Sequence, residues 1–295
     1  MASNEAQKLT AELKKHAKSV GADLIGIAGI GRFAGIAAAN HPSSIFPEAK
    51  SVIVIGKRIV RGALRGVEEG TQFGNYRMYG YSWLENRFLA QCTFKASEFL
   101  EAQGWEAVPI LNLPTQIPPM GVPVEPGKPA PNVLVDVDAA AVRAGLGEIG
   151  YLGVFLSPEF GPRQRLQAII TDAELVEDPI FGGEICDRSP ELAASCPLEA
   201  IDAKKEQVIE ICGKKMRTAT INYRRCRSCQ NGAGPNRYHA AGLPDRIGAL
   251  CVRTSMDRLE KQGRLSNKFQ APFRKRDPWK VVGAIPLFDE GQDIE

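Results

Sequence analysis

The sequence predicts a layered core of the α/β or α+β class. Residues 1–175 alternate between segments with helical periodicity and short apolar segments typical of buried strands. The composition is that of an ordinary globular protein, with 44% hydrophobic and 24% charged positions among 295 residues. The character changes near residue 180, because six of the seven cysteines lie at position 186 or later. We therefore expect a second domain after the first.

The first elements follow from simple periodicity. A helix is expected from Asn4, whose side chain can cap it, to Gly21, because apolar residues recur on one face of residues 9–17. Two apolar runs follow at residues 23–30 and 51–55, and both predict buried strands.

The next segment, residues 71–81, combines aromatic residues with glycines, and we expect a loop there. Ser82 can cap a long helix that ends at about residue 103, just before Gly104. Residues 106–111 are typical of a third strand.

A proline-rich segment interrupts the alternation. Residues 114–131 hold seven prolines, which exclude both a helix and a central strand. A segment of this kind is either a surface loop or a lid over a pocket. A strand over residues 132–137, a short helix over 137–144 and a strand over 167–171 complete the first region.

The charge balance and the lack of long apolar runs exclude several function classes. The net charge is +3, from 37 basic and 34 acidic residues, which is too balanced to indicate a nucleic-acid binder. No apolar run reaches about 18 residues, so no membrane span is expected, and the N-terminus has no apolar signal core. We therefore expect a cytoplasmic protein whose reduced cysteines serve a metal site, a redox role or plain burial.

Three glycines, Gly145, Gly147 and Gly150, have the spacing of a dinucleotide-binding fingerprint. That fingerprint should follow a strand and open a helix, whereas here a helical stretch precedes it. The glycines can instead form a tight turn that needs positive φ. The interpretation we favour is that small residues let a large planar cofactor lie against the backbone.

The cysteines after residue 180 resemble a two-cluster ferredoxin pattern that is partly lost. Cys186 and Cys196 are ten residues apart, as are the first and last cysteines of the bacterial ferredoxin run. In two-cluster ferredoxins the last cysteine of each run binds the cluster of the other run. One site would then comprise Cys186, Ser189, Leu192 and Ser255, and the other Cys196, Cys226, Cys229 and Cys251.

Only the second of these sites keeps four thiols. We therefore predict one [4Fe–4S] cluster, bound by Cys196, Cys226, Cys229 and Cys251. Zinc, which also accepts four cysteines, and a decayed domain without metal are the alternatives. The two remaining cysteines, Cys92 and Cys212, are expected to be small buried apolar residues.

Three segments together resemble a known family. Ala144–Gly150, Leu156–Arg163 and Ile170–Leu175 occur in the order of an AGLG-x-x-G turn, a "tP-x-(Y/F)-G" strand and a "TD-x-x-L" end. This pattern, followed by ferredoxin cysteines, resembles the epoxyqueuosine reductases and their reductive-dehalogenase relatives. The resemblance covers roughly residues 1–280 in layout.

The resemblance implies an α+β fold with a nitroreductase-like mixed-sheet core and helices on both faces, followed by a small ferredoxin-like domain. Residues 1–180 would be the corrinoid-binding core, 181–262 the degenerate iron–sulfur domain, and 263–295 a basic extension wrapping the core. The implied function is a cobalamin-dependent oxidoreductase with electron transfer through the cluster. The alternative is a non-catalytic corrinoid-binding or handling protein with a vestigial ferredoxin domain.

Reduction at such a centre needs a proton donor. The catalytic aspartate of the resemblance corresponds to Asp138 or Asp136, and a desolvated aspartate can have a raised pKa. Asp138 can alternatively cap the short helix that follows. Tyr79 can donate a proton, or it can pack with its neighbours Tyr76 and Tyr81 over a pocket.

The cofactor contacts expected with a corrinoid are Tyr76, Gly145, Gly147, Gly150 and Arg163. For Arg163 the alternative is an exposed surface charge. The partners expected are a small-molecule substrate and an external electron donor such as ferredoxin or flavodoxin. Residues 264–280 interleave aromatic and basic residues, which can bind RNA or wrap the domain. We favour wrapping and expect neither a membrane nor a nucleic-acid partner.

Overall fold

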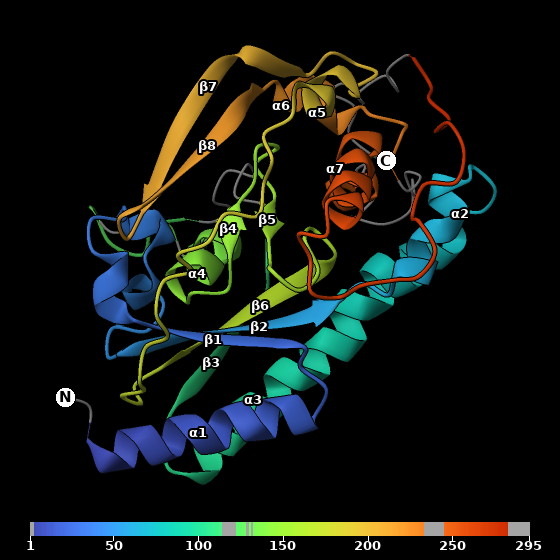
Figure 1. Ribbon diagram of the computed structural model, residues 1–295. Coiled ribbons are helices and arrows are strands. Elements are labelled where there is room, and N and C mark those ends of the chain that lie inside the picture. The colour runs from blue at the N-terminus through green and yellow to red at the C-terminus, as the bar shows by residue number, and fades with distance from the viewer. Residues whose placement is uncertain (1–2, 114–121, 128–129, 131, 233–244, 283–295) are drawn as a thin grey trace, which may run out of the picture.

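The fold is α+β, in agreement with the sequence prediction. The computed structural model describes residues 3–113, 122–127, 130, 132–232 and 245–282 (Figure 1). Its main sheet has the strand order β1-β2-β6-β3, formed by Leu24–Gly29, Ser51–Arg58, Gln164–Thr171 and Ala107–Ile110. Each of these pairs is antiparallel. The prediction of a mixed sheet is therefore wrong for the described strands, because an apolar run such as β2 shows burial but not strand direction.

The main sheet is buried on both faces. Ile53 and Ile55 pack with helices α1 (Asn4–Ser19) and α3 (Ala90–Ala102) on one face. The alternate residues Val52 and Val54 pack with helix α4 (Val137–Arg143) on the other face. Burial of each such side chain contributes about 1.5–3 kcal/mol. The predicted helices on both faces are present (Figure 1).

Two predicted boundaries at the N-terminal half are corrected. Ser3, not Asn4, caps α1, since its hydroxyl accepts a 3.1 Å hydrogen bond from the amide of Ala6. The predicted loop over 71–81 becomes helical from Tyr76 onward, with π-helical turns at Tyr76–Ser82 and Leu84–Leu89 that lead into α3. Gly80 does not break this helix. Its missing side chain leaves room for the Tyr76 ring, which a Cβ would approach to 2.5 Å.

The strand predicted over residues 132–137 is absent. Leu134 makes its backbone hydrogen bonds outside any sheet, with its amide donating to Ala39 (3.0 Å) and its carbonyl accepting from Asn40 Nδ2 (2.6 Å). These side-chain and loop partners replace a strand ladder. Most of the proline-rich segment lies outside the described residues, and the described stretch 122–127 forms no helix or strand.

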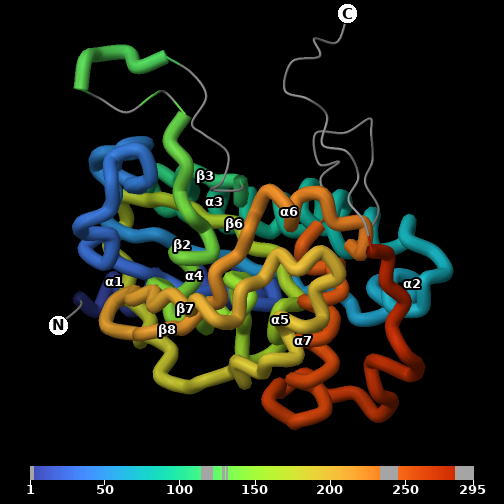
Figure 2. Tube along the Cα trace, turned by 90° about the horizontal axis from the view of Figure 1, so that it is seen from above, coloured from blue at the N-terminus to red at the C-terminus, as the bar shows by residue number. Residues whose placement is uncertain are grey.

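The second region forms a hairpin and several short helices on the α4 side of the sheet. Figure 1 and Figure 2 show the hairpin crossing α4 and the helices α5, α6 and α7 beyond one of its ends. The elements are β4 (Glu148–Ile149), β5 (Phe155–Leu156), α5 (Pro190–Ala194), β7 (Ile201–Ile211), β8 (Lys214–Ile221), α6 (Tyr223–Arg227) and α7 (Leu250–Lys261). Short 3₁₀ helices occur at Ile30–Phe33, Ala38–Asn40, Pro42–Ser44, Arg61–Leu64 and Arg246–Gly248.

The two cysteines outside the proposed cluster differ in burial. Cys92 is buried in the core between α1 and α3, as predicted. Cys212 is exposed, which corrects its predicted burial, because it occupies the turn of the β7–β8 hairpin with a φ of 49°. In the part of the chain that the structure describes, no helix is long and apolar enough to cross a membrane.

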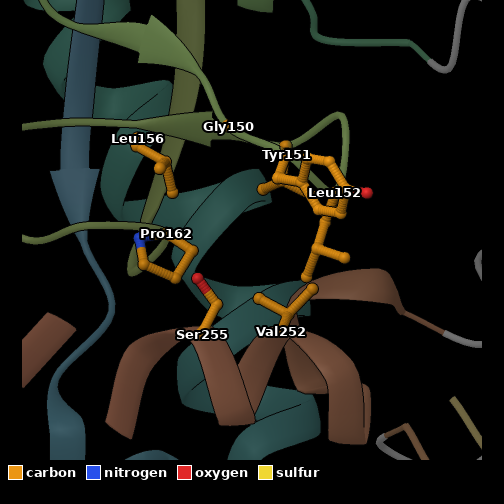
Figure 3. A pocket seen from close by; sticks show the side chains of 8 residues that line it. Gly150, Tyr151, Leu152, Leu156, Pro162, Val252 and Ser255 are labelled. Carbon is orange, nitrogen blue, oxygen red and sulfur yellow. The ribbon is translucent and has the colours of Figure 1, made fainter. Parts of the chain in front are cut away.

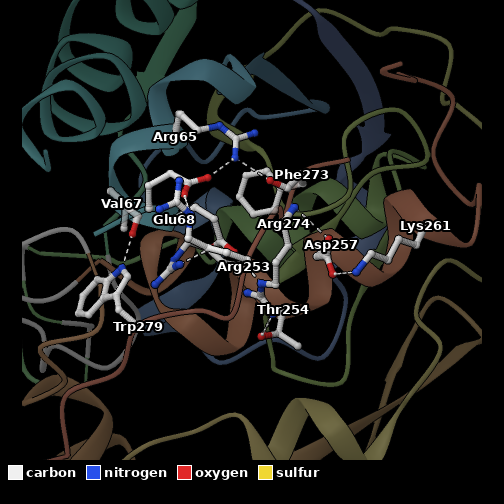
Figure 4. Close-up of polar contacts among 12 residues, drawn as sticks. Arg65, Val67, Glu68, Arg253, Thr254, Asp257, Lys261, Phe273, Arg274 and Trp279 are labelled. Carbon is white, nitrogen blue, oxygen red and sulfur yellow. Dashed lines mark hydrogen bonds and ion pairs between the residues drawn. The ribbon is translucent and has the colours of Figure 1, made fainter. Parts of the chain in front are cut away.

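The segment after α7 packs against α2 (Arg65–Glu68) (Figure 4). Arg253 of α7 and Arg274 of this segment both pair with the buried carboxylate of Glu68. Trp279 Nε1 donates a 2.5 Å hydrogen bond to the carbonyl of Val67. These contacts hold the described part of residues 263–282 to the first region.

Candidate functional site

The four cysteines predicted to bind a cluster lie within electrostatic reach of one another. Cys196 follows α5, Cys226 and Cys229 lie at α6, and Cys251 is in the first turn of α7. Burial, together with the charges of the other three thiols, raises the pKa of Cys251 to about 12, against an opposing effect of Arg246. Burial also raises the pKa of Cys226, with smaller contributions from Cys229 and Cys196. The fold therefore brings together four thiols that span 56 positions of the chain, from 196 to 251.

Backbone amides point at two of these sulfur atoms. The amide of Ala200 donates to Cys196 Sγ at 3.3 Å, and that of Asn231 donates to Cys229 Sγ at 3.4 Å. Such hydrogen bonds to sulfur are a feature of iron–sulfur ligation. Among the described residues, no three His, Cys, Asp or Glu side chains form a ready site for a metal ion.

Arg246 places a positive charge beside two of the four thiols, Cys226 and Cys251. Its guanidinium hydrogen-bonds to Cys226 and lowers the pKa values of Cys226 and Cys251, which burial raises. The same side chain donates to the carbonyls of Leu152 and Gly153 and lies 5.4 Å from the centroid of the Tyr223 ring. A cation held in this way stabilises thiolates, which are the form that binds metal. The four cysteines thus have the donor chemistry of a thiolate-bound group, but in the described residues they are not arranged as a ready metal site.

The other set of ferredoxin positions packs as an apolar core. Cys186 Sγ accepts a 3.2 Å hydrogen bond from the amide of Tyr151, and Leu192 is fully buried beside it. Ser189 caps α5. A cavity of about 10 Å³ lies beside Ser255 (Figure 3), room for at most one water molecule. These positions contribute one thiol only.

Asp138 lies in the first turn of α4 with a pKa raised to about 6. Burial is the main cause and the charge of Asp136 adds to it, whereas Arg246, Asn112 and Arg165 lower the pKa. Asp138 does not cap α4, because Asp136 does so, with Oδ1 accepting a 2.9 Å hydrogen bond from the amide of Ala139. The side chain of Asp138 therefore remains available for proton exchange near neutral pH.

A second charged group lies next to Asp138. The Tyr76 hydroxyl donates a 2.7 Å hydrogen bond to Asp245, which also pairs with Arg165. Arg165 donates to the carbonyl of Gly80 at 3.1 Å and stacks 4.7 Å from the centroid of the Tyr81 ring. Burial raises the pKa of Tyr76 well above its ordinary value. Tyr76 is thus a buried, protonated donor engaged with Asp245.

The remaining predicted site residues have other contacts. Tyr79 is 46% exposed and lines a separate surface hollow of about 220 Å³. Arg163 is buried and donates to the carbonyl of Ile59 (3.0 Å) and to Asn267 Oδ1 (2.8 Å), so it is not an exposed surface charge. Catalysis by Tyr79 and cofactor binding by Arg163 stay predictions.

The three glycines of the turn pack against the chain itself. A Cβ at Gly145 would lie 2.1 Å from the carbonyl oxygen of Pro179, and one at Gly147 would lie 2.0 Å from that of Leu156. At Gly150 the Leu156 side chain would be 2.6 Å away. Close approach of the backbone accounts for Gly145 and Gly147, and the Leu156 side chain accounts for Gly150. Their contact with a cofactor stays a prediction.

Sequence reasoning missed Arg165, Asp245 and Arg246. A signal existed for Arg165, because Arg165 and Gln167 interrupt the apolar strand β6, and buried polar groups need partners. The partners come from residues 76–85 and 245, which only the fold brings close.

Part of the chain is similar in sequence to known proteins. No family model matches the chain. The tetrachloroethene reductive dehalogenase of Dehalobacter restrictus (strain DSM 9455 / PER-K23) is 32% identical over 121 residues, which is 40% of this chain and 18% of that protein. The enzyme of the same name from Sulfurospirillum multivorans is 44% identical over 66 residues, 21% of this chain and 13% of its own length.

Solved structures show the same fold. The catabolic reductive dehalogenase NpRdhA has a TM-score of 0.56 at 17% identity, covering 90% of this chain and 35% of its own. An epoxyqueuosine reductase has a TM-score of 0.52 at 16% identity, covering 89% and 67%. This chain resembles the reductive dehalogenases and epoxyqueuosine reductases. The chain spans under a fifth of the curated dehalogenases it matches, and about a third of NpRdhA.

One comparison bears on the expected partners. An epoxyqueuosine reductase, with a TM-score of 0.50 at 17% identity over 92% of this chain and 69% of its own, was solved with a tRNA-Tyr stem loop. The expectation that a nucleic acid is not a partner therefore has no support from these relatives.

Proposed function

We propose that this chain is a reductase of the epoxyqueuosine reductase and reductive dehalogenase type, with one [4Fe–4S] cluster on Cys196, Cys226, Cys229 and Cys251. The observation that carries the proposal is that the charges of the other three thiols act on Cys251, with Arg246 beside Cys226 and Cys251 and its charge also reaching Asp138. In this proposal residues 1–180 form a nitroreductase-like core and residues 181–262 a degenerate ferredoxin-like domain.

In a reductive reaction the substrate needs electrons and a proton, and different residues of this chain would supply them. The cluster, when bound, supplies electrons one at a time. Asp138 holds a proton that it can release near neutral pH, because burial raises its pKa to about 6. Arg165 and Arg246 limit that rise and so keep the carboxyl within reach of deprotonation. The product would take its proton from Asp138.

The cobalamin of this proposal rests on the resemblance. The residues predicted to contact it do not present a free face for it in the structure, because the three glycines abut their own chain and Tyr76 and Arg163 are buried and paired. We therefore derive no step through a corrinoid.

The alternative is a corrinoid-binding or handling protein that is not an enzyme. The packing of Leu192 and Ser255 in an apolar core favours it, since a two-cluster electron path is not built here. The four remaining thiols favour the reductase.

The test is anaerobic purification followed by measurement of iron, sulfide, zinc and cobalt, with a visible spectrum before and after addition of cobalamin. The expected result is about four irons per chain, as one [4Fe–4S] cluster requires. Cys229→Ser should abolish iron binding. Cys186→Ser is the matched control and should retain it, because Cys186 belongs to the apolar core.

Each other outcome has a definite meaning. Zinc in place of iron, or equal iron loss in both variants, would contradict the proposed cluster site. Bound cobalamin without iron would favour the carrier alternative. Iron without a spectral response to cobalamin would remove the corrinoid from the proposal.

A further inference from the structure

We propose that the basic surface formed by Lys204, Lys205, Arg224, Arg225 and Arg227 docks an acidic electron-donor protein. This inference rests on the proposed function, because it assigns a role to the outer face of the four-thiol site. It names where a donor binds and which charge that donor carries.

The arginines of this basic surface surround a predicted cluster ligand. Helix α6 runs from Tyr223 to Arg227, and three of its five residues are exposed arginines that flank Cys226 in the sequence. Cys226 itself is only partly buried. Arg224 and Arg225 have no carboxylate partner among the described residues. The helix that carries Cys226 thus also carries exposed positive charge.

Two lysines extend the basic surface. Strand β7 pairs with β8 first at Ile201↔Ile221 and Asp202↔Thr220. The next pair is Glu206↔Ala219, so a bulge lies between Asp202 and Glu206 on β7. Lys204 and Lys205 lie in this bulge and are exposed. Since β8 ends at Ile221 and α6 begins at Tyr223, the bulge lies beside the arginine helix (Figure 1).

The acidic residues nearby do not cancel this charge. Glu199, Asp202 and Glu206 are the carboxylates on the same stretch, and Glu206 pairs with Arg217 at 3.6 Å, which leaves two carboxylates against Lys204, Lys205, Arg224 and Arg225. The Asp202 carboxylate accepts a 2.9 Å hydrogen bond from the backbone amide of Lys204. The net positive surface would steer an acidic partner and orient it on the thiol site.

The surface is better suited to an acidic protein than to RNA. Single-stranded RNA is recognised chiefly by exposed aromatic side chains on which bases stack. None of the large exposed apolar side chains of the described residues lies in 199–205 or 222–229. The aromatic ring available there, Tyr223, is stacked against Arg246.

The position of the surface favours an electron donor among acidic proteins. Electron transfer between proteins slows steeply with distance, so a donor must approach the cluster closely. Cys196, Cys226 and Cys251 are all partly buried, and Cys226 is the one of them that lies on the arginine-bearing helix. In this proposal α6 is the route from the surface to the four thiols.

The experiment compares two double variants of equal charge change. Arg224→Glu with Arg225→Glu reverses the proposed surface, and Lys8→Glu with Lys15→Glu reverses two exposed charges on α1, on the other face of the sheet. Binding of fluorescently labelled flavodoxin, an acidic one-electron carrier, is measured by anisotropy at low and high salt. Reduction of the iron-loaded chain is followed with flavodoxin hydroquinone and, separately, with dithionite.

The expected result is a Kd for flavodoxin that is about tenfold higher in the arginine variant at low salt, with less salt dependence than in the parent. The α1 variant should stay within about twofold of the parent. Dithionite should reduce all three loaded proteins at the same rate. Arg224→Gln with Arg225→Gln should show a smaller loss in the same direction.

An unchanged Kd in the arginine variant would overturn the proposal. The proposal would also be overturned if the arginine variant lost binding to a tRNA stem loop but still bound flavodoxin like the parent. The surface would then be a nucleic-acid site. The binding measurement needs no cluster, so it is separate from the iron content that tests the proposed function.

Discussion

The hydroxyl of Tyr76 donates a 2.7 Å hydrogen bond to Oδ2 of Asp245, 169 residues further along the chain. Asp245 also pairs with Arg165 of β6 and caps the 3₁₀ turn that holds Arg246. One carboxylate thus links the π-helical segment, the central sheet and the residue beside the four thiols. The environment of Asp138 depends on this link, because the charges of Arg165 and Arg246 both act on it.

Replacing Tyr76 with Phe should destabilise the protein. The change removes a hydrogen bond to an ionised group and leaves the ring in place, so we expect a loss of about 2 kcal/mol in the free energy of unfolding. Urea denaturation measures it. The control, Tyr79→Phe, alters an exposed hydroxyl and should stay within about 0.5 kcal/mol of the parent. Equal losses in the two variants would mean that the Asp245 contact contributes nothing.

Asp138 should make stability depend on pH. Its pKa is raised from 3.8 to about 6 on folding, so the folded chain binds this proton more tightly than the unfolded chain does. The stability that this group contributes is then greatest below pH 4 and is lost as pH rises through 6. Asp138→Asn removes the dependence. We expect the variant to be more stable than the parent by about 3 kcal/mol at pH 8, with the difference vanishing near pH 4.

Denaturation midpoints at pH 4.5, 6 and 8 check this expectation. The comparison variant is Asp136→Asn, which alters the exposed cap of α4 and removes one charge that raises the pKa of Asp138, so the pH dependence should shrink but persist. A parent and Asp138→Asn variant whose stabilities run parallel across this range would show that Asp138 has an ordinary pKa.

Arg246 should hold the metal group in place. Arg246→Gln keeps a hydrogen-bond donor but removes the charge beside Cys226 and Cys251. Outer residues that stabilise ligands typically change metal affinity by about 10- to 100-fold. We expect the visible iron–sulfur absorbance to decay at least about tenfold faster in the presence of a chelator. Arg264→Gln, which removes a contact to carbonyls of 185 and 186, is the control, and an equal decay rate in it would assign the effect to lost packing.

The elements predicted from strong local sequence patterns are present in the structure. The strand β2 could be predicted from its apolar run, and the structure buries each of the residues 51–56. The helix α4 could be predicted from the helical pattern of a short segment. The ferredoxin spacing is a local pattern that survives the loss of the other site, and it picked out four thiols whose charges act on one another in the fold. Their binding of a cluster stays a prediction.

The failures have a different cause. Glycine and aromatic residues at 71–81 indicate a loop on propensity alone, but Gly80 is there to admit the Tyr76 ring. Residues 132–136 have strand propensity, yet their backbone finds partners at Ala39 and Asn40 instead of a sheet edge. Arg165, Asp245 and Arg246 were missed because each is defined by a partner that is distant in sequence. Tertiary contacts override propensity in every one of these cases.

Glu68 should be indispensable to the packing of the C-terminal segment. Its carboxylate is 3% exposed and pairs with Arg253, which is fully buried, and with Arg274 (Figure 4). Glu68→Gln leaves two guanidiniums without a carboxylate in this network, and breaking a buried pair in this way costs about 3–5 kcal/mol. The control, Glu98→Gln, breaks an exposed pair with Lys95 on α3 and should cost less than about 1 kcal/mol. Thermal and urea unfolding measure both, and limited proteolysis after residue 262 reports whether the segment has detached. Similar stabilities for the two variants would show that the buried network does not anchor the segment.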